Sequence, residues 1–146
     1  MIMADLFTRN RIQYQETVES WEEAINLAAK PLVEEAVTSE AYVQSVIELC
    51  HEKGPYMNIG PEVVLAHARP MPDTKSAAVS LMITKDAIDF VEAGHKARIW
   101  LFLATPDAES HIELIQKLAS ILMNADKMQT ILQARSVEAI WHVIND

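Results

Sequence analysis

The most apolar run in the chain, residues 99–103 (IWLFL), limits the fold more than any other feature of the sequence. Its uninterrupted β-branched, aromatic and leucine side chains predict a strand that is buried on both faces of a sheet. The run at 63–66 (VVLA) is shorter, also carries no charge, and predicts a second buried strand. The other expected strands are an outer one at 11–15, one at 56–59, an interior one at 76–84, and a short strand or bend at 87–90.

Helical patterns separate these strands. Ser20 followed by Glu23 is a capping-box pattern that predicts a helix from residue 21, and Pro31 is expected to end that helix. After the 99–103 strand, apolar residues recur at i, i+3 and i+4 spacing, and His111 begins this inward-facing stripe. The same kind of spacing places Tyr42 and Ala139 on buried helix faces, and Met123 is expected to fill a gap in the core. The expected helices, cap residues included, span 20–30, 32–37, 39–54, 107–122, 128–133 and 136–145.

The chain has 146 residues, half of them apolar and only three of them glycine. These values predict one compact globular domain, 1–146, with a core of its own. Because helices and strands alternate, we expect an α/β fold in which one sheet is sandwiched between layers of helix.

The charge, the cysteine content and the apolar runs indicate which partners and which cellular compartment to expect. A net charge of −9 argues against nucleic acid or an anionic membrane as the main partner. The single cysteine, Cys50, cannot form an intrachain disulfide, which fits a reducing cytosol. No apolar run approaches the roughly 20 residues of a membrane span, and residues 1–5 show no secretory signal pattern. We therefore expect a cytoplasmic protein.

The segment 54–70 (GPYMNIGPEVVLAHARP) holds two of the three glycines and three of the six prolines. His67 follows the apolar strand at 63–66, and prolines stop the strand from continuing. A side chain at the point where a strand leaves an open α/β sheet lies where such folds place reactive groups. Arg69, two residues on, is a fixed cation able to steer a phosphoryl group towards the imidazole.

This segment resembles the active-site segment of the IIA domains of the bacterial phosphoenolpyruvate-dependent sugar phosphotransferase system. Within the mannitol/fructose-type superfamily it is most similar to the ascorbate-type branch. The first block that carries the resemblance contains Gly54-Pro55-Tyr56 and His67-Ala68-Arg69-Pro70. The second block is LFLATPD at 101–107, followed by Ser110-His111.

The resemblance implies a three-layer α/β/α fold with a mixed sheet. It further implies a phosphocarrier in which His67 accepts a phosphoryl group from phospho-HPr and passes it to a cysteine of the cognate EIIB. The sugar taken up through the membrane component EIIC would be L-ascorbate or a related sugar acid or pentitol. The family's second active-site histidine matches His111. No cofactor and no metal is implied, and a homodimer is compatible with the family.

Phosphoryl transfer through imidazole needs an accessible ring nitrogen, a contact that orients the other nitrogen, and donors around the phosphate. His67 is the expected acceptor, and His111 lies near a helix start, where free N–H groups favour an anion. Arg69 is the expected phosphate or partner contact, with a surface salt bridge as the alternative. Ser110 is expected near the same site, with a helix cap as the alternative.

Two positions depart from the family pattern. Ala66 stands where a proline is common, and Glu62 stands where a glycine usually follows the loop proline. We expect a less rigid backbone before His67 and an added negative charge near the phosphate from Glu62.

Three other functions remain open from the sequence. A regulatory, nitrogen-related IIA protein would use the same phosphorylation, although the His67-Ala68-Arg69 sequence favours the sugar branch. His67, His95 and His111 would form the metal site of a hydrolase in the second alternative, but the chain has no HExxH or CxxC motif. The third is a non-catalytic binding module on the same fold.

Overall fold

The computed structural model describes residues 7–72 and 74–144, which form a single domain around one five-stranded sheet. The sheet is mixed, and its strand order is β1-β4-β5-β3-β2. Strands β1 and β4 are parallel, as are β3 and β5, whereas β4 pairs antiparallel with β5 and β2 with β3. The strands are β1 (Ile12–Gln15), β2 (Asn58–Gly60), β3 (Glu62–Ala66), β4 (Ala78–Asp89) and β5 (Lys96–Ala104).

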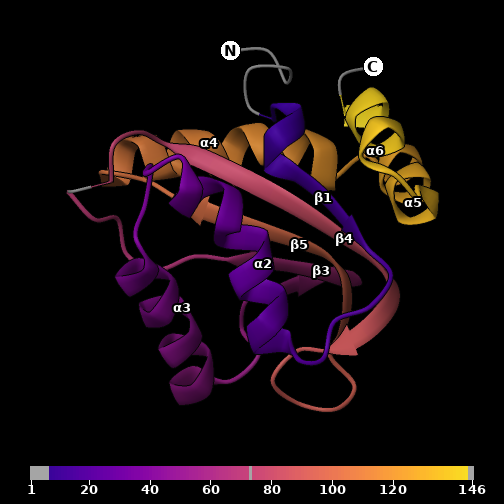
Figure 1. Ribbon diagram of the computed structural model, residues 1–146, viewed down its shortest axis with the longest axis horizontal. Helices are drawn as coiled ribbons and strands as arrows, with labels where there is room; N and C mark the ends of the chain where they lie inside the picture. Colours follow the sequence, from indigo (N-terminus) through magenta and orange to yellow (C-terminus); the bar gives the residue numbers. More distant parts are fainter. Residues whose placement is uncertain (1–6, 73, 145–146) are drawn as a thin grey trace.

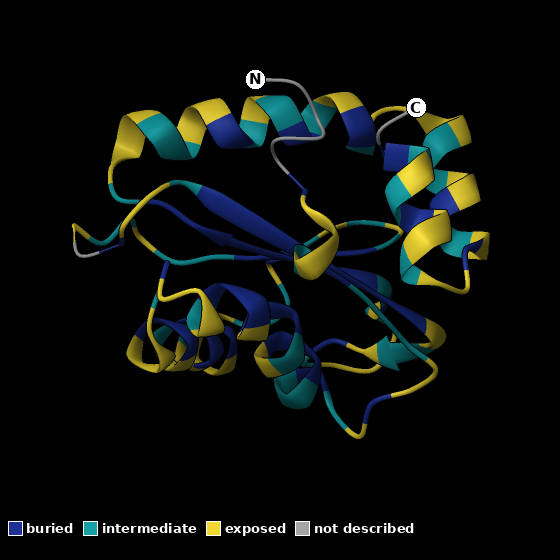
Figure 2. Cartoon of the chain, turned by 45° about the horizontal axis from the view of Figure 1, so that its top comes forward, coloured by how far each residue is buried: buried dark blue, intermediate teal, exposed yellow. Residues whose placement is uncertain are grey.

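Helices cover both faces of this sheet, as the sequence predicted. Figure 1 shows α2 and α3 together on one side of the strands, and Figure 2 shows α4 running along the opposite side. The helices are η1 (Arg9–Arg11), α2 (Trp21–Glu34), α3 (Glu40–Lys53), α4 (Ala108–Leu122), α5 (Ala125–Gln133) and α6 (Val137–Ile144). None of the helices in the described part of the chain combines the length and apolar character that a membrane span requires.

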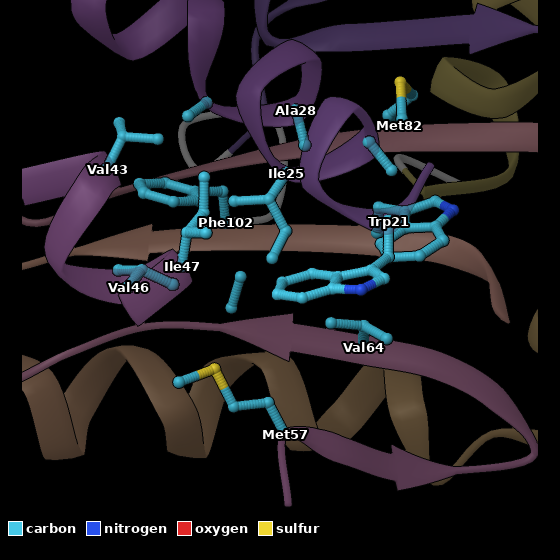
Figure 3. Packing of buried hydrophobic residues seen from close by; sticks show 14 of the residues in the cluster. Trp21, Ile25, Ala28, Val43, Val46, Ile47, Met57, Val64, Met82 and Phe102 are labelled. Atoms are coloured by element: carbon cyan, nitrogen blue, oxygen red, sulfur yellow. The ribbon is translucent and has the colours of Figure 1, made fainter. Parts of the chain in front are cut away.

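The expectation that residues 99–103 are buried on both faces is confirmed. Trp100 and Phe102 point into the core formed with α2 and α3, where Figure 3 shows Phe102 among side chains of both helices. Ile99, Leu101 and Leu103 point into the second core, under α4, α5 and α6. Because β5 is the middle strand, its two sets of side chains join the two helix layers through the sheet.

Pro31 does not end α2, which corrects the prediction of a break and of a separate helical piece at 32–37. The helix continues to Glu34. Proline has no N–H to donate to the Leu27 carbonyl, and the side chain of Gln13 on β1 donates to that carbonyl instead. A Schellman-type motif follows Glu34 and ends the helix. In this motif Ala36 has a φ of 58°, and the Val37 N–H donates to the Leu32 carbonyl.

Three further expectations differ from the structure. Strand β4 is one strand of 12 residues, with a bulge between Ile83 and Ile88 in place of the predicted interruption. Ala139 and Met123, both predicted to be buried, are exposed, and Met123 is 85% accessible because it caps the end of α4. The expected end of the last helix at Asn145 lies outside the described residues, as do the residues of the signal-peptide prediction.

Candidate functional site

His67 and His111 meet at one edge of the sheet. Strands β3 and β5 are parallel, with Ala66 opposite Phe102, so the segments that follow their carboxyl ends leave the sheet side by side. His67 immediately follows β3, and the segment after β5 leads through Thr105 into α4, whose first turn ends at His111. We refer to this edge as the His67 edge.

The two imidazole rings face each other across the His67 edge. Their centroids are 5.6 Å apart, and their planes are inclined by 48°. Both residues are half-buried, so each ring is held by the fold and still reached by solvent. This separation leaves room for a group bound to one ring to contact the other.

The hydrogen bond of His67 identifies its free nitrogen. Its Nδ1 lies 2.8 Å from the carbonyl oxygen of Leu65. A carbonyl oxygen only accepts hydrogen bonds, so Nδ1 carries the proton. In the neutral ring the lone pair is then on Nε2, which is the nucleophilic atom.

His111 is oriented by Thr105, which is 1% exposed. The Thr105 hydroxyl lies 3.3 Å from Nδ1 of His111. Burial, and then the charge of nearby His67, lower the pKa of His111 below the usual histidine value of 6.5. The lowered pKa favours the neutral ring at pH 7, and when Thr105 donates to Nδ1 of that ring the other nitrogen, Nε2, carries the proton.

Helix α4 begins at the site because Asp107 caps it. The Asp107 carboxylate accepts a hydrogen bond from the Ser110 N–H at 2.8 Å, and this bond lowers the pKa of Asp107. The Ser110 hydroxyl donates to the Asp107 carbonyl at 3.3 Å. Ser110 is therefore not the cap that the sequence offered as its alternative role; it lies in the first turn, one residue before His111.

Arg69 is exposed on the loop after His67, and it shares a groove with residues of α3. It lines an open groove of about 380 Å³ together with Glu48, Glu52 and the apolar residues Leu49 and Met71. Within residues 7–72 and 74–144 the guanidinium makes no ion pair, so the salt bridge considered for it is not formed there.

Tyr42, on α3, contributes a hydroxyl group to this region, whereas its helical spacing predicted only a buried side chain. Its ring is 2% exposed and packs edge-on against Phe102 at 5.8 Å. Its hydroxyl accepts from the Ala68 N–H at 3.0 Å and donates to the Leu103 carbonyl at 2.9 Å. Helical spacing reveals the buried position of Tyr42 but not the partners of its hydroxyl, and Thr105 gave no signal beyond its place in the second block.

The opposite edge of the sheet, the Arg98 edge, holds Glu62, His95 and Arg98. His95 precedes β5, whose nine residues place it about 30 Å from Thr105. The three histidines of the hydrolase alternative therefore cannot bind one ion, and no group of three His, Cys, Asp or Glu suited to a metal occurs among the described residues. That alternative is wrong.

Glu62 also lies far from His67, which corrects the expectation that its charge disturbs a phosphate. It begins β3 and His67 follows the end of that strand, about 16 Å away. Its carboxylate is 3.8 Å from the guanidinium of Arg98. Glu62 has a φ of 64°, a backbone conformation that glycine adopts without the steric cost it has for other residues.

Comparison with known proteins places these features in a family. Residues 5–146 match the family model described as phosphoenolpyruvate-dependent sugar phosphotransferase system, EIIA 2. The chain is 27% identical to the mannitol-specific cryptic phosphotransferase enzyme IIA component of Escherichia coli, over 99% of each chain. It is 25% identical to the ascorbate-specific PTS system EIIA component of Salmonella typhi, over 96% of this chain and 92% of the other.

Solved structures show the same fold. The solution structure of a mannitol-specific cryptic phosphotransferase enzyme IIA from E. coli covers 99% of each chain at 26% identity, with a TM-score of 0.91. A complex of enzyme IIA and phosphorylated enzyme IIB for mannitol, also from E. coli, matches at 21% identity. It covers 95% of this chain and 96% of the other, with a TM-score of 0.76.

Proposed function

The chain belongs to the EIIA 2 family of the phosphoenolpyruvate-dependent sugar phosphotransferase system, and we propose that His67 is its phosphoryl acceptor. In this proposal phospho-HPr donates the group to His67, and the phosphorylated protein passes it to a cysteine of the cognate EIIB. The observation that carries the proposal is the His67 ring itself. Its Nδ1 is held by the Leu65 carbonyl, Nε2 has no hydrogen-bond partner among the described residues, and the ring lies beside that of His111.

In the first step the Nε2 lone pair of His67 attacks the phosphorus of phospho-HPr. The N–P bond forms as the bond between phosphorus and HPr breaks, and HPr keeps that electron pair. The Nδ1 proton stays on the ring and is shared with the Leu65 carbonyl, which stabilises the positive charge that develops on the imidazole. The transition state is loose, so correct alignment of Nε2 supplies most of the catalysis.

His111 is proposed to bind the transferred group. Its neutral state avoids two adjacent cationic rings before transfer, and its Nε2–H is available to a phosphoryl oxygen while Thr105 donates to Nδ1. The free N–H groups of the first turn of α4 favour the same anion. Ser110 belongs to this turn, and Arg69 serves as a contact for the incoming partner or its phosphate.

In the second step a cysteine thiolate of EIIB attacks the phosphorus, the S–P bond forms, and His67 recovers the electron pair on Nε2. The fold shared with an enzyme IIA that forms a complex with phosphorylated enzyme IIB supports this partner. Relatives at 27% and 25% identity are named for mannitol and for ascorbate. The proposed substrate, taken up through EIIC, is therefore a sugar alcohol or sugar acid similar in size to mannitol or ascorbate.

Incubation with phosphoenolpyruvate, Enzyme I and HPr tests the proposal. The wild-type chain should acquire one acid-labile, base-stable phosphate, and His67→Ala should remain unlabelled. His111→Ala should label slowly and pass the group to EIIB poorly, because its nucleophile is intact but its phosphate donor is gone. Full labelling of His67→Ala would place the acceptor elsewhere, and normal onward transfer by His111→Ala would remove His111 from the site.

A further inference from the structure

Hydrogen bonds join the loop after His67 to the body of the protein at several described residues. The Met71 N–H donates to the Thr105 carbonyl at 3.0 Å, and farther along the loop the Lys75 N–H donates to the Val37 carbonyl at 3.1 Å. At the near end, the Ala68 N–H donates to the phenol oxygen of Tyr42. The hydroxyl of a side chain from α3 therefore holds the residue that directly follows His67.

The Tyr42 hydroxyl lies between the loop that follows His67 and the strand β5 that leads towards His111. Ala68 shares its peptide bond with His67, so a fixed Ala68 N–H fixes the orientation of the peptide plane on the carboxyl side of His67. Leu103, which accepts the Tyr42 proton, lies on β5 two residues before Thr105, the partner of His111. One phenol thus ties the backbone next to His67 to the strand that positions His111.

Resting on the function proposed above, we infer that Tyr42 is a positioning residue for phosphoryl transfer. Its hydroxyl holds the peptide after His67 against β5, so that Nδ1 of His67 stays on the Leu65 carbonyl and the ring stays beside that of His111. Tyr42 does not touch the phosphoryl group, because it packs on the α3 side of the sheet against Phe102.

The position requires a phenol and not just a buried ring. With phenylalanine the ring would still pack against Phe102, but the Ala68 N–H and the Leu103 carbonyl would both lose their hydrogen bond to the phenol oxygen. The peptide after His67 would then be free to rotate, and Nε2 would spend less time aligned with an incoming phosphorus. Misplacement by about 1 Å lowers rates by about 100-fold in reactions that depend on alignment.

Tyr42→Phe tests this inference, with Thr84→Val as the matched control. Thr84 is a buried hydroxyl on β4 towards the Arg98 edge, where it contacts Trp100 Nε1 at 3.4 Å and the Arg98 carbonyl at 3.5 Å. Both variants lose one buried hydroxyl and should unfold at a lower temperature. Only Tyr42→Phe should slow labelling by phospho-HPr, by about 10- to 100-fold, with the final one phosphate per chain and the KM for phospho-HPr unchanged.

A measurement without any phosphodonor keeps this inference separate from the function. In nitrogen-15 NMR spectra, the wild-type Ala68 amide should be protected from exchange, and His67 should be in the Nδ1–H form. Tyr42→Phe should lose both features, and Thr84→Val should keep both. An unprotected Ala68 amide in the wild type, equal labelling rates for the wild type and Tyr42→Phe, or equal slowing by Thr84→Val would each overturn the role of Tyr42. Absence of labelling in the wild type would contradict the proposed function instead.

Discussion

The two edges of the sheet carry the same kinds of residue and use them differently. At the Arg98 edge, the Arg98 guanidinium is bound by the Glu62 carboxylate and by the carbonyls of Thr84 and Leu132. At the His67 edge, Arg69 is exposed and makes no ion pair within the described residues. Arg98 has its hydrogen-bonding capacity satisfied inside the fold, whereas we propose that Arg69 contacts another molecule.

The histidines of the two edges differ in the same way. His95 closes the turn between β4 and β5, where its carbonyl accepts from Phe90 and its Nδ1 lies 3.4 Å from Asn58 Oδ1. His67 has one nitrogen fixed by the backbone, its other nitrogen has no hydrogen-bond partner in the described part of the chain, and its ring lies next to a second imidazole. The presence of a histidine therefore does not distinguish the two edges. What differs is the hydrogen bonding of the ring and the neighbour it lies against.

The largest expected effect comes from making the same substitution at both edges. His67→Gln should abolish labelling by phospho-HPr, because the amide side chain offers no nucleophilic nitrogen. His95→Gln should label at the wild-type rate, since it alters only the turn between β4 and β5. Radiolabel counted per chain distinguishes the two variants. A loss of labelling in His95→Gln would show that the two edges do not differ in function.

Substitution of the two arginines should give the next largest effect. Arg98→Gln should lower the free energy of unfolding by about 1–3 kcal/mol, because the carbonyls of Thr84 and Leu132 lose a charged donor, and should leave the labelling rate unchanged. Arg69→Gln should do the reverse, with unchanged stability and slower phosphoryl transfer. Urea denaturation and labelling kinetics measure both, and a stability loss in Arg69→Gln would show that it too is a structural residue.

Substitution of Glu62 tests whether the Arg98 edge serves stability. Glu62→Gly should raise the free energy of unfolding by about 0.5–1 kcal/mol, because glycine adopts the φ of 64° without steric cost. Glu62→Gln is the control, since it keeps the strained backbone and removes only the charge that faces Arg98. Stability measured by urea denaturation should rise for glycine alone, and equal values for the two variants would assign the effect to charge.

The smallest expected effect is a pH dependence of stability that arises at the His67 edge. The pKa of His111 is lowered in the folded state, so the unfolded chain binds its proton more readily. The stabilisation from neutral His111 is complete above the unfolded pKa of about 6.5 and is lost as pH falls through the lower folded pKa. His111→Gln should remove this part of the slope in urea denaturation between pH 7.5 and 5; an unchanged slope would assign it to other groups.

Much of the architecture could be predicted because it depends on neighbouring residues. Ser39 and Asp107 begin α3 and α4 where their short polar side chains cap the free N–H groups, and Gly54 ends α3 with a φ of 82°. The apolar run in β5 required cover on both faces whatever its partners. Pro31 was misread because its effect on α2 depends on Gln13, a residue of another element that bonds the Leu27 carbonyl.

The site was predictable only in part, for the same reason. His67 and His111 were identified from their family blocks, but their separation follows from the parallel pairing of β3 with β5. The roles of Leu65 and Thr105 as ring partners are not visible in the sequence, since a carbonyl carries no residue signature and threonine is common at strand ends.

The amino-acid order alone determined the helices with their caps, the central apolar strand, and the position of His67 at a strand end. These features depend on backbone conformation and on the periodicity of apolar side chains, which act over a few residues. Tertiary structure decided which atoms meet: the ring of His67 with that of His111, the hydroxyl of Tyr42 with Ala68 and Leu103, and Glu62 with Arg98. Hydrogen bonds act over about 3 Å, so they exist only after the packing of helices on the sheet has brought distant residues within that distance.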